Sequence, residues 1–164
     1  MAKSIGKVFE EEIKASIPLG FFVERYKDDT AGFYGVTNPA DYRLYRYPYT
    51  FLWELKTHKG KSLPLAKIRL NQIKGMYRDI VYRGVFAGFI INFRELEEAY
   101  YIPVERVAKS FYTFTHTGEI EGINPTGRKS IPVSWCRTYG ERIAQEKKRV
   151  RYTYNLTEFF KRWY

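Results

Sequence analysis

Three polar side chains in the first part of the chain have types and spacing that suit a metal site beside a bound phosphate. Asp41 precedes a run over 50–57 that has the composition of a strand, and this run carries Glu54 and Lys56. Side chains alternate between the two faces of a strand, so Glu54 and Lys56 point the same way. The opposite face is apolar and is the predicted core side, with Phe51, Trp53 and Leu55.

Oxygen ligands from two carboxylates suit a hard cation such as Mg²⁺, and a neighbouring ammonium can hold or deprotonate a water. This combination of side chains is typical of a Mg²⁺-dependent phosphodiesterase. An isolated Glu-x-Lys is also typical of an ordinary ion pair on a solvated strand face. Zinc lacks ligands, because the chain has two histidines, His58 and His116, which we interpret as surface residues.

The composition favours a polyanionic partner. The chain has 28 Lys and Arg against 18 Asp and Glu, a formal net charge of +10 and an isoelectric point near 9.6. Basic side chains displace condensed counterions from nucleic acid, although charge alone does not establish nucleic-acid binding. A late basic run either follows DNA or forms a solvated face, and both interpretations stay open. It comprises Lys147, Lys148, Arg149 and Arg151.

With 164 residues the chain is predicted to form a single domain over 1–164. The single cysteine, Cys136, rules out an internal disulfide framework and is predicted to be a small buried apolar residue. The first six residues lack the apolar core of a signal peptide, and no apolar run approaches the about 20 residues of a membrane span. We therefore expect a cytoplasmic protein without a membrane association.

The elements predicted around these residues alternate between helical and strand periodicity. Segment 115–132 is rich in glycine and proline and is predicted to be loop, as is the polar stretch 27–35. Inner positions of the second helix include Ile68 and Gln72. The predicted helices are 4–17, 66–82, 104–110 and 155–163, and the predicted strands are 21–26, 42–49, 50–57, 85–93 and 99–103.

Short motifs recur along the chain in an order that resembles a known family. They are Gly6-Lys7-Val8-Phe9-Glu10-Glu11, Pro39-Ala40-Asp41, Glu54-Leu55-Lys56-Thr57, Lys61-Ser62-Leu63-Pro64-Leu65, Asn71-Gln72-Ile73 and Gly127-Arg128-Lys129-Ser130-Ile131. Together they resemble the PD-(D/E)XK nuclease superfamily, and more closely the RecU family of Holliday junction resolvases. The acidic and Glu-x-Lys pieces alone are weak evidence, and the surrounding pieces in the same order carry the resemblance.

The resemblance implies an α/β fold with a restriction-endonuclease-like core, in which helices flank a central mixed sheet. It also implies a metal-dependent endodeoxyribonuclease that resolves four-way DNA junctions by paired symmetric nicks, with Mg²⁺ as cofactor and Mn²⁺ as a substitute. Two symmetric cuts imply a homodimer, since one small domain addresses one scissile strand. Branched DNA is the expected partner, and no small-molecule cofactor is expected.

The matched motifs imply roles for individual residues. Asp41 and Glu54 would bind the metal with the Leu55 carbonyl as a third ligand, and Lys56 would orient the attacking water. Glu10 would be a further acid from the first helix, with Glu11 as the alternative, and Gln72 would reach the scissile phosphate or an ordered water. Contacts to DNA are expected from Lys61, Ser62, Asn71, Arg128, Lys129 and Ser130.

One departure from the resemblance concerns the stretch between the first strand and Asp41. It looks shorter than in cellular members, where this region projects a stalk used in junction binding, and a reduced stalk fits a bacteriophage version. Two alternative functions stay open: a nuclease of the same superfamily that acts on other DNA structures, and a non-catalytic architectural DNA-binding protein. Cleavage assays on junctions, flaps and linear duplex separate them.

Overall fold

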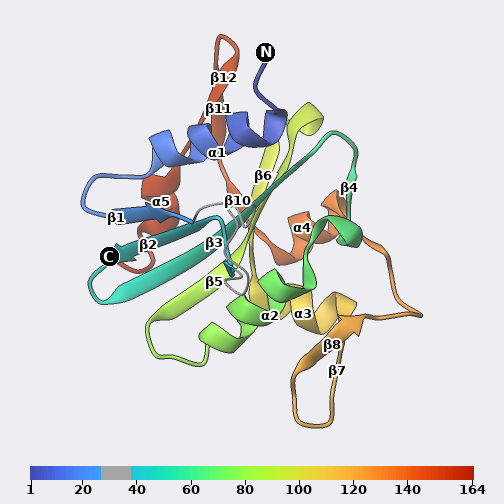
Figure 1. Cartoon of the computed structure of the whole chain (residues 1–164). Coiled ribbons are helices and arrows are strands. Elements are labelled where there is room, and N and C mark those ends of the chain that lie inside the picture. Colours follow the sequence, from blue (N-terminus) through green and yellow to red (C-terminus); the bar gives the residue numbers. More distant parts are fainter. Residues whose placement is uncertain (27–37) are drawn as a thin grey trace.

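A mixed six-stranded sheet forms the centre of the part of the protein that the computed structural model describes, residues 1–26 and 38–164 (Figure 1). Its strand order is β1-β2-β3-β5-β6-β10. β3 runs parallel to β5, while β2, β6 and β10 each run antiparallel to their sheet neighbours. The predicted α/β class, with a central mixed sheet flanked by helices, is confirmed.

The sheet strands are β1 (Phe22–Arg25), β2 (Tyr42–Arg46), β3 (Tyr49–His58), β5 (Val85–Phe93), β6 (Glu98–Pro103) and β10 (Glu141–Ile143). Short ribbons outside this sheet pair β4 (Ser62–Pro64) with β9 (Ser130–Pro132), β7 (Tyr112–Phe114) with β8 (Ile120–Ile123), and β11 (Gln145–Lys148) with β12 (Arg151–Tyr154). The helices are α1 (Ile5–Ser16), α2 (Leu70–Asp79), α3 (Val104–Phe111), α4 (Val133–Tyr139) and α5 (Leu156–Phe160), with 3-10 turns η1 (Leu65–Lys67) and η2 (Arg94–Leu96).

Each face of the sheet is covered by its own hydrophobic core. The α1 and α5 helices pack on one face, where Phe9, Phe51, Trp53 and Phe160 are buried. The α2, α3 and α4 helices cover the other face, which takes Leu52 of β3. The alternation predicted for β3 is therefore confirmed, because its odd-numbered apolar residues lie in the first core and Leu52 in the second.

Several helix boundaries and short strands were predicted wrongly from the sequence. The second helix begins at Leu70 rather than 66, because η1 ends at an extended Ile68 and Arg69 is also extended. Ile68 is therefore buried outside the helix. Segment 115–132 is not all loop, since it contains β8 and β9. The closing helix ends at Phe160, and the expected turn over 27–35 with the shortened stalk region lies outside the described residues.

Two further expectations concern burial and the membrane. Cys136 is buried and unpaired, as predicted. Among the described helices, none is both long and apolar enough to cross a membrane.

Candidate active site

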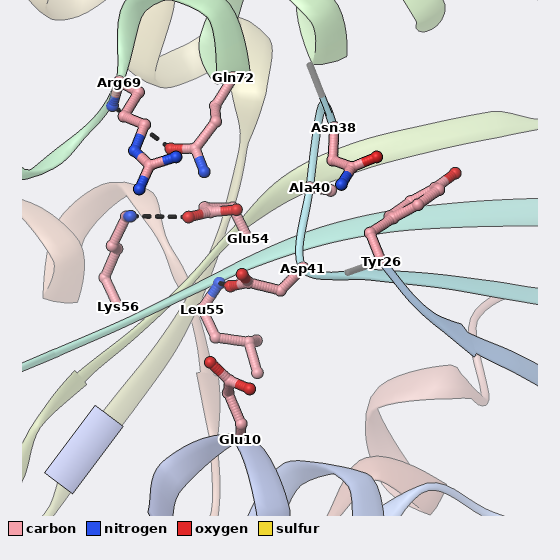
Figure 2. A pocket seen from close by; sticks show the side chains of 10 residues that line it. All are labelled: Glu10, Tyr26, Asn38, Ala40, Asp41, Glu54, Leu55, Lys56, Arg69 and Gln72. Carbon is pink, nitrogen blue, oxygen red and sulfur yellow. Dashed lines mark hydrogen bonds and ion pairs between the residues drawn. The ribbon is translucent and has the colours of Figure 1, made fainter. Parts of the chain in front are cut away.

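The candidate site lies beside β3, at the point where its partner strand β2 begins. Pairing between β2 and β3 runs from Arg46 opposite Tyr49 to Tyr42 opposite Trp53, whereas β5 accompanies β3 as far as His58. The last residues of β3 therefore have a sheet neighbour on one side, and the other side faces a cavity of about 190 Å³. The side chains around this cavity come from α1, β3, the start of α2 and the segment before β2 (Figure 2).

Asp41 is held in place through its backbone and its side chain. Its backbone N–H donates to the carbonyl of Trp53 at 2.9 Å, and its own carbonyl accepts from Tyr26 N–H at 2.9 Å. Its Oδ2 accepts from the backbone N–H of Leu55 at 2.7 Å. In a strand, the N–H and C=O of one residue point to the same side, so the Leu55 carbonyl also faces the cavity. Two of the predicted metal ligands thus meet at one place.

Glu54 and Lys56 project from the next positions of β3 on the α2 side. Lys56 Nζ lies 2.6 Å from Glu54 Oε1, and the Glu54 side chain is 2% exposed. Glu54 Oε2 is buried without a hydrogen-bond partner in the described part of the chain. A buried carboxylate oxygen without a partner is costly, so this atom is a position where a cation or water would be strongly favoured.

The two carboxylates disturb each other's ionisation. Burial, followed by the negative charge of Glu54, raises the pKa of Asp41 to about 7, against an ordinary value of 3.8. Burial also raises the pKa of Glu54, although Lys56 and Gln72 act in the opposite direction. Two acids that share a desolvated cavity are stabilised in their charged forms by a cation between them. The donor set therefore fits a hard divalent cation.

This arrangement predicts a pH dependence of stability in protein freed of divalent metal by a chelator. The pKa of Asp41 is about 7 in the folded protein and near 3.8 in the unfolded protein. The protonated Asp41 carboxyl therefore makes its full contribution to the free energy of unfolding below pH 4, and this contribution is lost as the pH rises to about 7. Over this pH range the melting temperature of the wild-type protein should fall relative to that of Asp41→Asn, because the asparagine side chain does not ionise. Differential scanning calorimetry between pH 4 and 8 measures the difference. Parallel curves for the two proteins would rule out the raised pKa.

Gln72 and Glu10 approach the cavity from opposite faces of the sheet (Figure 2). Gln72 is buried, and its Oε1 accepts from the backbone N–H of Arg69 at 3.3 Å, which turns its amide nitrogen toward Glu54. That amide lowers the pKa of Glu54, although Glu54 Oε2 has no hydrogen-bond partner among residues 1–26 and 38–164. Glu10 lines the cavity but is paired with Arg25 at 3.0 Å. Glu11, the alternative acid, instead pairs with Lys3 at 2.7 Å.

Within the described ranges, no three acidic, histidine or cysteine side chains are close enough to enclose a metal by themselves. Asp41 and Glu54 would therefore share the ion with the Leu55 carbonyl, waters and substrate oxygens. Mg²⁺ suits such a site, since it keeps several waters and needs one or two carboxylates.

The residues expected to contact DNA do not line this cavity. Ser62 and Ser130 lie on the paired strands β4 and β9, and their hydroxyl oxygens are 2.6 Å apart. Lys129 donates from Nζ to the carbonyl of Asn124 at 2.7 Å. Lys61 and Arg128 are exposed near the same ribbon, whereas Asn71 lines a different hollow at the start of α2.

Sequence reasoning missed three residues that line the cavity: Tyr26, Asn38 and Arg69. The Arg69 guanidinium lies over the ion pair of Glu54 and Lys56, and its charge also lowers the pKa of Glu54 (Figure 2). The position directly before α2 could have identified Arg69, but the helix was predicted to begin at residue 66, four residues before Leu70.

A family model, a curated relative and a solved structure are similar to this chain. The family model described as recombination protein U matches residues 6–158. The SPbeta prophage-derived uncharacterized protein YotM of Bacillus subtilis (strain 168) is 31% identical over 170 residues, which cover 96% of this chain and 85% of that protein. Among solved structures, Hjc of Archaeoglobus fulgidus, described as a Holliday junction resolvase, matches at 15% identity and a TM-score of 0.46. That match covers 75% of this chain and 83% of the Hjc chain.

Proposed function

This chain belongs to the RecU family of Holliday junction resolvases, and from that membership we propose that it cuts four-way DNA junctions by paired, symmetric, Mg²⁺-dependent nicks. The observation that carries the proposal is the convergence of Asp41, Glu54 and Lys56 on one cavity in a chain with a net charge of +10. Mn²⁺ is the expected substitute metal, because it accepts the same oxygen ligands.

Asp41, Glu54 and the Leu55 carbonyl would hold the cation. When bound, it would neutralise charge on the scissile phosphate and lower the pKa of a coordinated water. Lys56 is fixed by its contact with Glu54 at 2.6 Å, so its ammonium can donate a hydrogen bond to the attacking water.

Arg69 and Gln72 occupy the α2 side of the cavity and would face the phosphate. A guanidinium there can stabilise the negative charge that grows on the phosphoryl oxygens, and a fixed amide can orient the phosphate or a water. Glu10 approaches from α1 and would assist as a further acid once its pairing with Arg25 adjusts to the substrate. Lys61, Ser62, Asn71, Arg128, Lys129 and Ser130 remain proposed contacts to the DNA flanking the cut.

Paired cuts require two such cavities. A chain of 164 residues has a radius of gyration of about 15 Å, so a single copy would reach one scissile strand. A twofold dimer presents the same cavity to two strands of a symmetric junction. We also propose that the protein is located in the cytoplasm, because its expected DNA substrate is there. We propose further a role in phage DNA metabolism, which the prophage origin of the B. subtilis relative supports.

A nicking assay tests the proposal. Labelled mobile four-way junctions, flaps and linear duplex of equal length are incubated with the protein at one salt concentration, with Mg²⁺ or with chelator. The expected result is paired nicking of the junction that requires the metal and exceeds cutting of the other DNAs. Preferential cutting of flaps or duplex would favour a different nuclease of the superfamily. Tight binding without nicking in Mg²⁺ or Mn²⁺ would favour an architectural protein.

A further inference from the structure

The hairpin of β11 and β12 is a basic projection that the site described above does not use. It is a narrow antiparallel ribbon separate from the main sheet, and it stands beside α1 (Figure 1). Its strands join through a two-residue turn, Arg149 and Val150, since Lys148 pairs with Arg151. Val150 is 81% exposed, so this turn is not packed against the domain.

The turn end of this hairpin carries unbalanced positive charge. Lys147, Lys148 and Arg149 are consecutive and exposed. In the described part of the chain, no carboxylate lies within 4.0 Å of their charged groups, and Arg151 is the hairpin cation with such a partner, Glu11 at 3.3 Å. Like charges held together on a ribbon repel one another, so an anion at this point would be bound favourably.

The backbone at the turn adds a second observation. Arg149 has φ +57°, a conformation that glycine or asparagine adopts at lower cost in a two-residue hairpin turn. The chain places an arginine at this position, where it extends the run of positive charge. The residue at this position therefore adds positive charge to the hairpin and is not the type that adopts this turn conformation at the lowest cost.

Hydrogen bonds to α1 and to the residue that follows η2 fix the base of the hairpin. The backbone N–H groups of Tyr152 and Tyr154 donate to Glu12 Oε1 and to Ser16 Oγ, each at 3.0 Å. The Tyr152 hydroxyl donates to Glu97 at 2.7 Å. An arm whose base is held in this way loses less conformational entropy when its tip binds a ligand.

The hairpin and the catalytic cavity lie on different sides of the same helix. Glu10 of α1 lines the cavity, whereas the next two residues, Glu11 and Glu12, contact the hairpin. A helix with its side chains is about 10–12 Å across, so DNA at the cavity would pass within a short distance of the hairpin.

We propose that Lys147, Lys148 and Arg149 form a DNA-binding arm that contacts backbone phosphates of the DNA held at the cavity. The inference rests on the proposed function, because it needs DNA at that cavity. The contact is electrostatic and independent of base sequence, as expected for lysine and arginine on phosphate.

A matched pair of double variants tests the arm. Lys148→Gln with Arg149→Gln removes two charges from the tip, and Lys109→Gln with Lys161→Gln removes two charges from surface ion pairs elsewhere. Fluorescence anisotropy with a labelled four-way junction and a linear duplex, in chelator, gives the dissociation constant between 50 and 200 mM KCl. Neither pair takes part in the proposed catalysis.

The tip variant should reduce the slope of log affinity against log salt by about 2, since each phosphate contact contributes about 0.9. Its affinity should fall by about tenfold or more at 100 mM salt, while the nicking rate of saturated junction stays within about twofold of wild type. The control variant should keep the wild-type slope. A tip variant that keeps the wild-type salt slope and affinity would contradict the proposal that the hairpin binds DNA.

Binding to the linear duplex tests the arm even if the protein does not cut junctions. If wild-type protein binds both DNAs and nicks neither, the proposed function fails, while the salt slopes still decide whether the arm contacts phosphates. If the tip variant slows nicking of saturated junction without a change in slope, the hairpin acts on catalysis and the arm proposal is wrong.

Discussion

Asp41→Asn should lower the rate of metal-dependent junction nicking by at least about a thousandfold, which corresponds to about 4 kcal/mol of transition-state stabilisation. The substitution preserves shape but removes one of the two carboxylates that are proposed to hold the metal in the cavity. Junction affinity should stay equal or rise, because a negative charge leaves a site that faces a polyanion. Single-turnover nicking and anisotropy on the same junction measure both quantities.

Asp79→Asn is the matched control for this experiment. Asp79 ends α2, pairs with Arg78 at 2.9 Å and does not line the cavity. Its variant should nick at close to the wild-type rate. Wild-type nicking by Asp41→Asn would remove Asp41 from the site, and equal losses in both variants would indicate a general effect of charge.

Glu12→Ala should be the most destabilising of the changes considered, by about 3–5 kcal/mol, because it leaves a largely buried arginine without its partner. Arg94 donates to Glu12 from Nη1 at 2.6 Å and from Nη2 at 2.8 Å, and the two side chains are 13% and 2% exposed. The same carboxylate accepts from the Tyr152 backbone N–H, so the hairpin also loses one of its attachments to α1. The melting temperature should fall by about 10 °C for a chain of this length.

Urea denaturation of three variants separates the ion pair from a generic loss of charge. Glu105→Ala breaks the exposed pair with Lys109 and should cost less than about 1 kcal/mol. The double variant Glu12→Ala with Arg94→Ala should recover part of the loss, because no buried charge is then left unpaired. A Glu12→Ala protein as stable as Glu105→Ala would contradict the proposed role of this pair.

The central strands and the grouping of Asp41, Glu54 and Lys56 around one cavity were predictable because their signals are local. The face alternation of β3 follows from a period of two residues, and β5 is an apolar run with clear ends at 85 and 93. Asp41 and Glu54 could be brought together from motif order, since a short hairpin connects β2 and β3. The geometry that makes the site chemically distinct is the buried Glu54 Oε2, which has no hydrogen-bond partner among the residues that the structure describes, and it is a tertiary property.

The residues that sequence reasoning missed depend on partners far away in the chain. Glu12 reads as a polar helix position until Arg94, 82 residues later, pairs with it. β4 and β9 are three residues each and form a ribbon by pairing with one another. The β11–β12 hairpin lacks the glycine or asparagine that announces a tight turn, and its strands carry no apolar alternation of useful length.

The most direct measurement of the central claim is the position of a bound divalent ion. Crystals of the wild-type protein grown with Mn²⁺, measured by anomalous scattering, should show an ion contacted by both Asp41 and Glu54, with the Lys56 ammonium beside it. The same peak should disappear in Asp41→Asn. An ion bound by one of these carboxylates alone, or Mn²⁺ bound elsewhere while this cavity stays empty, would contradict the account.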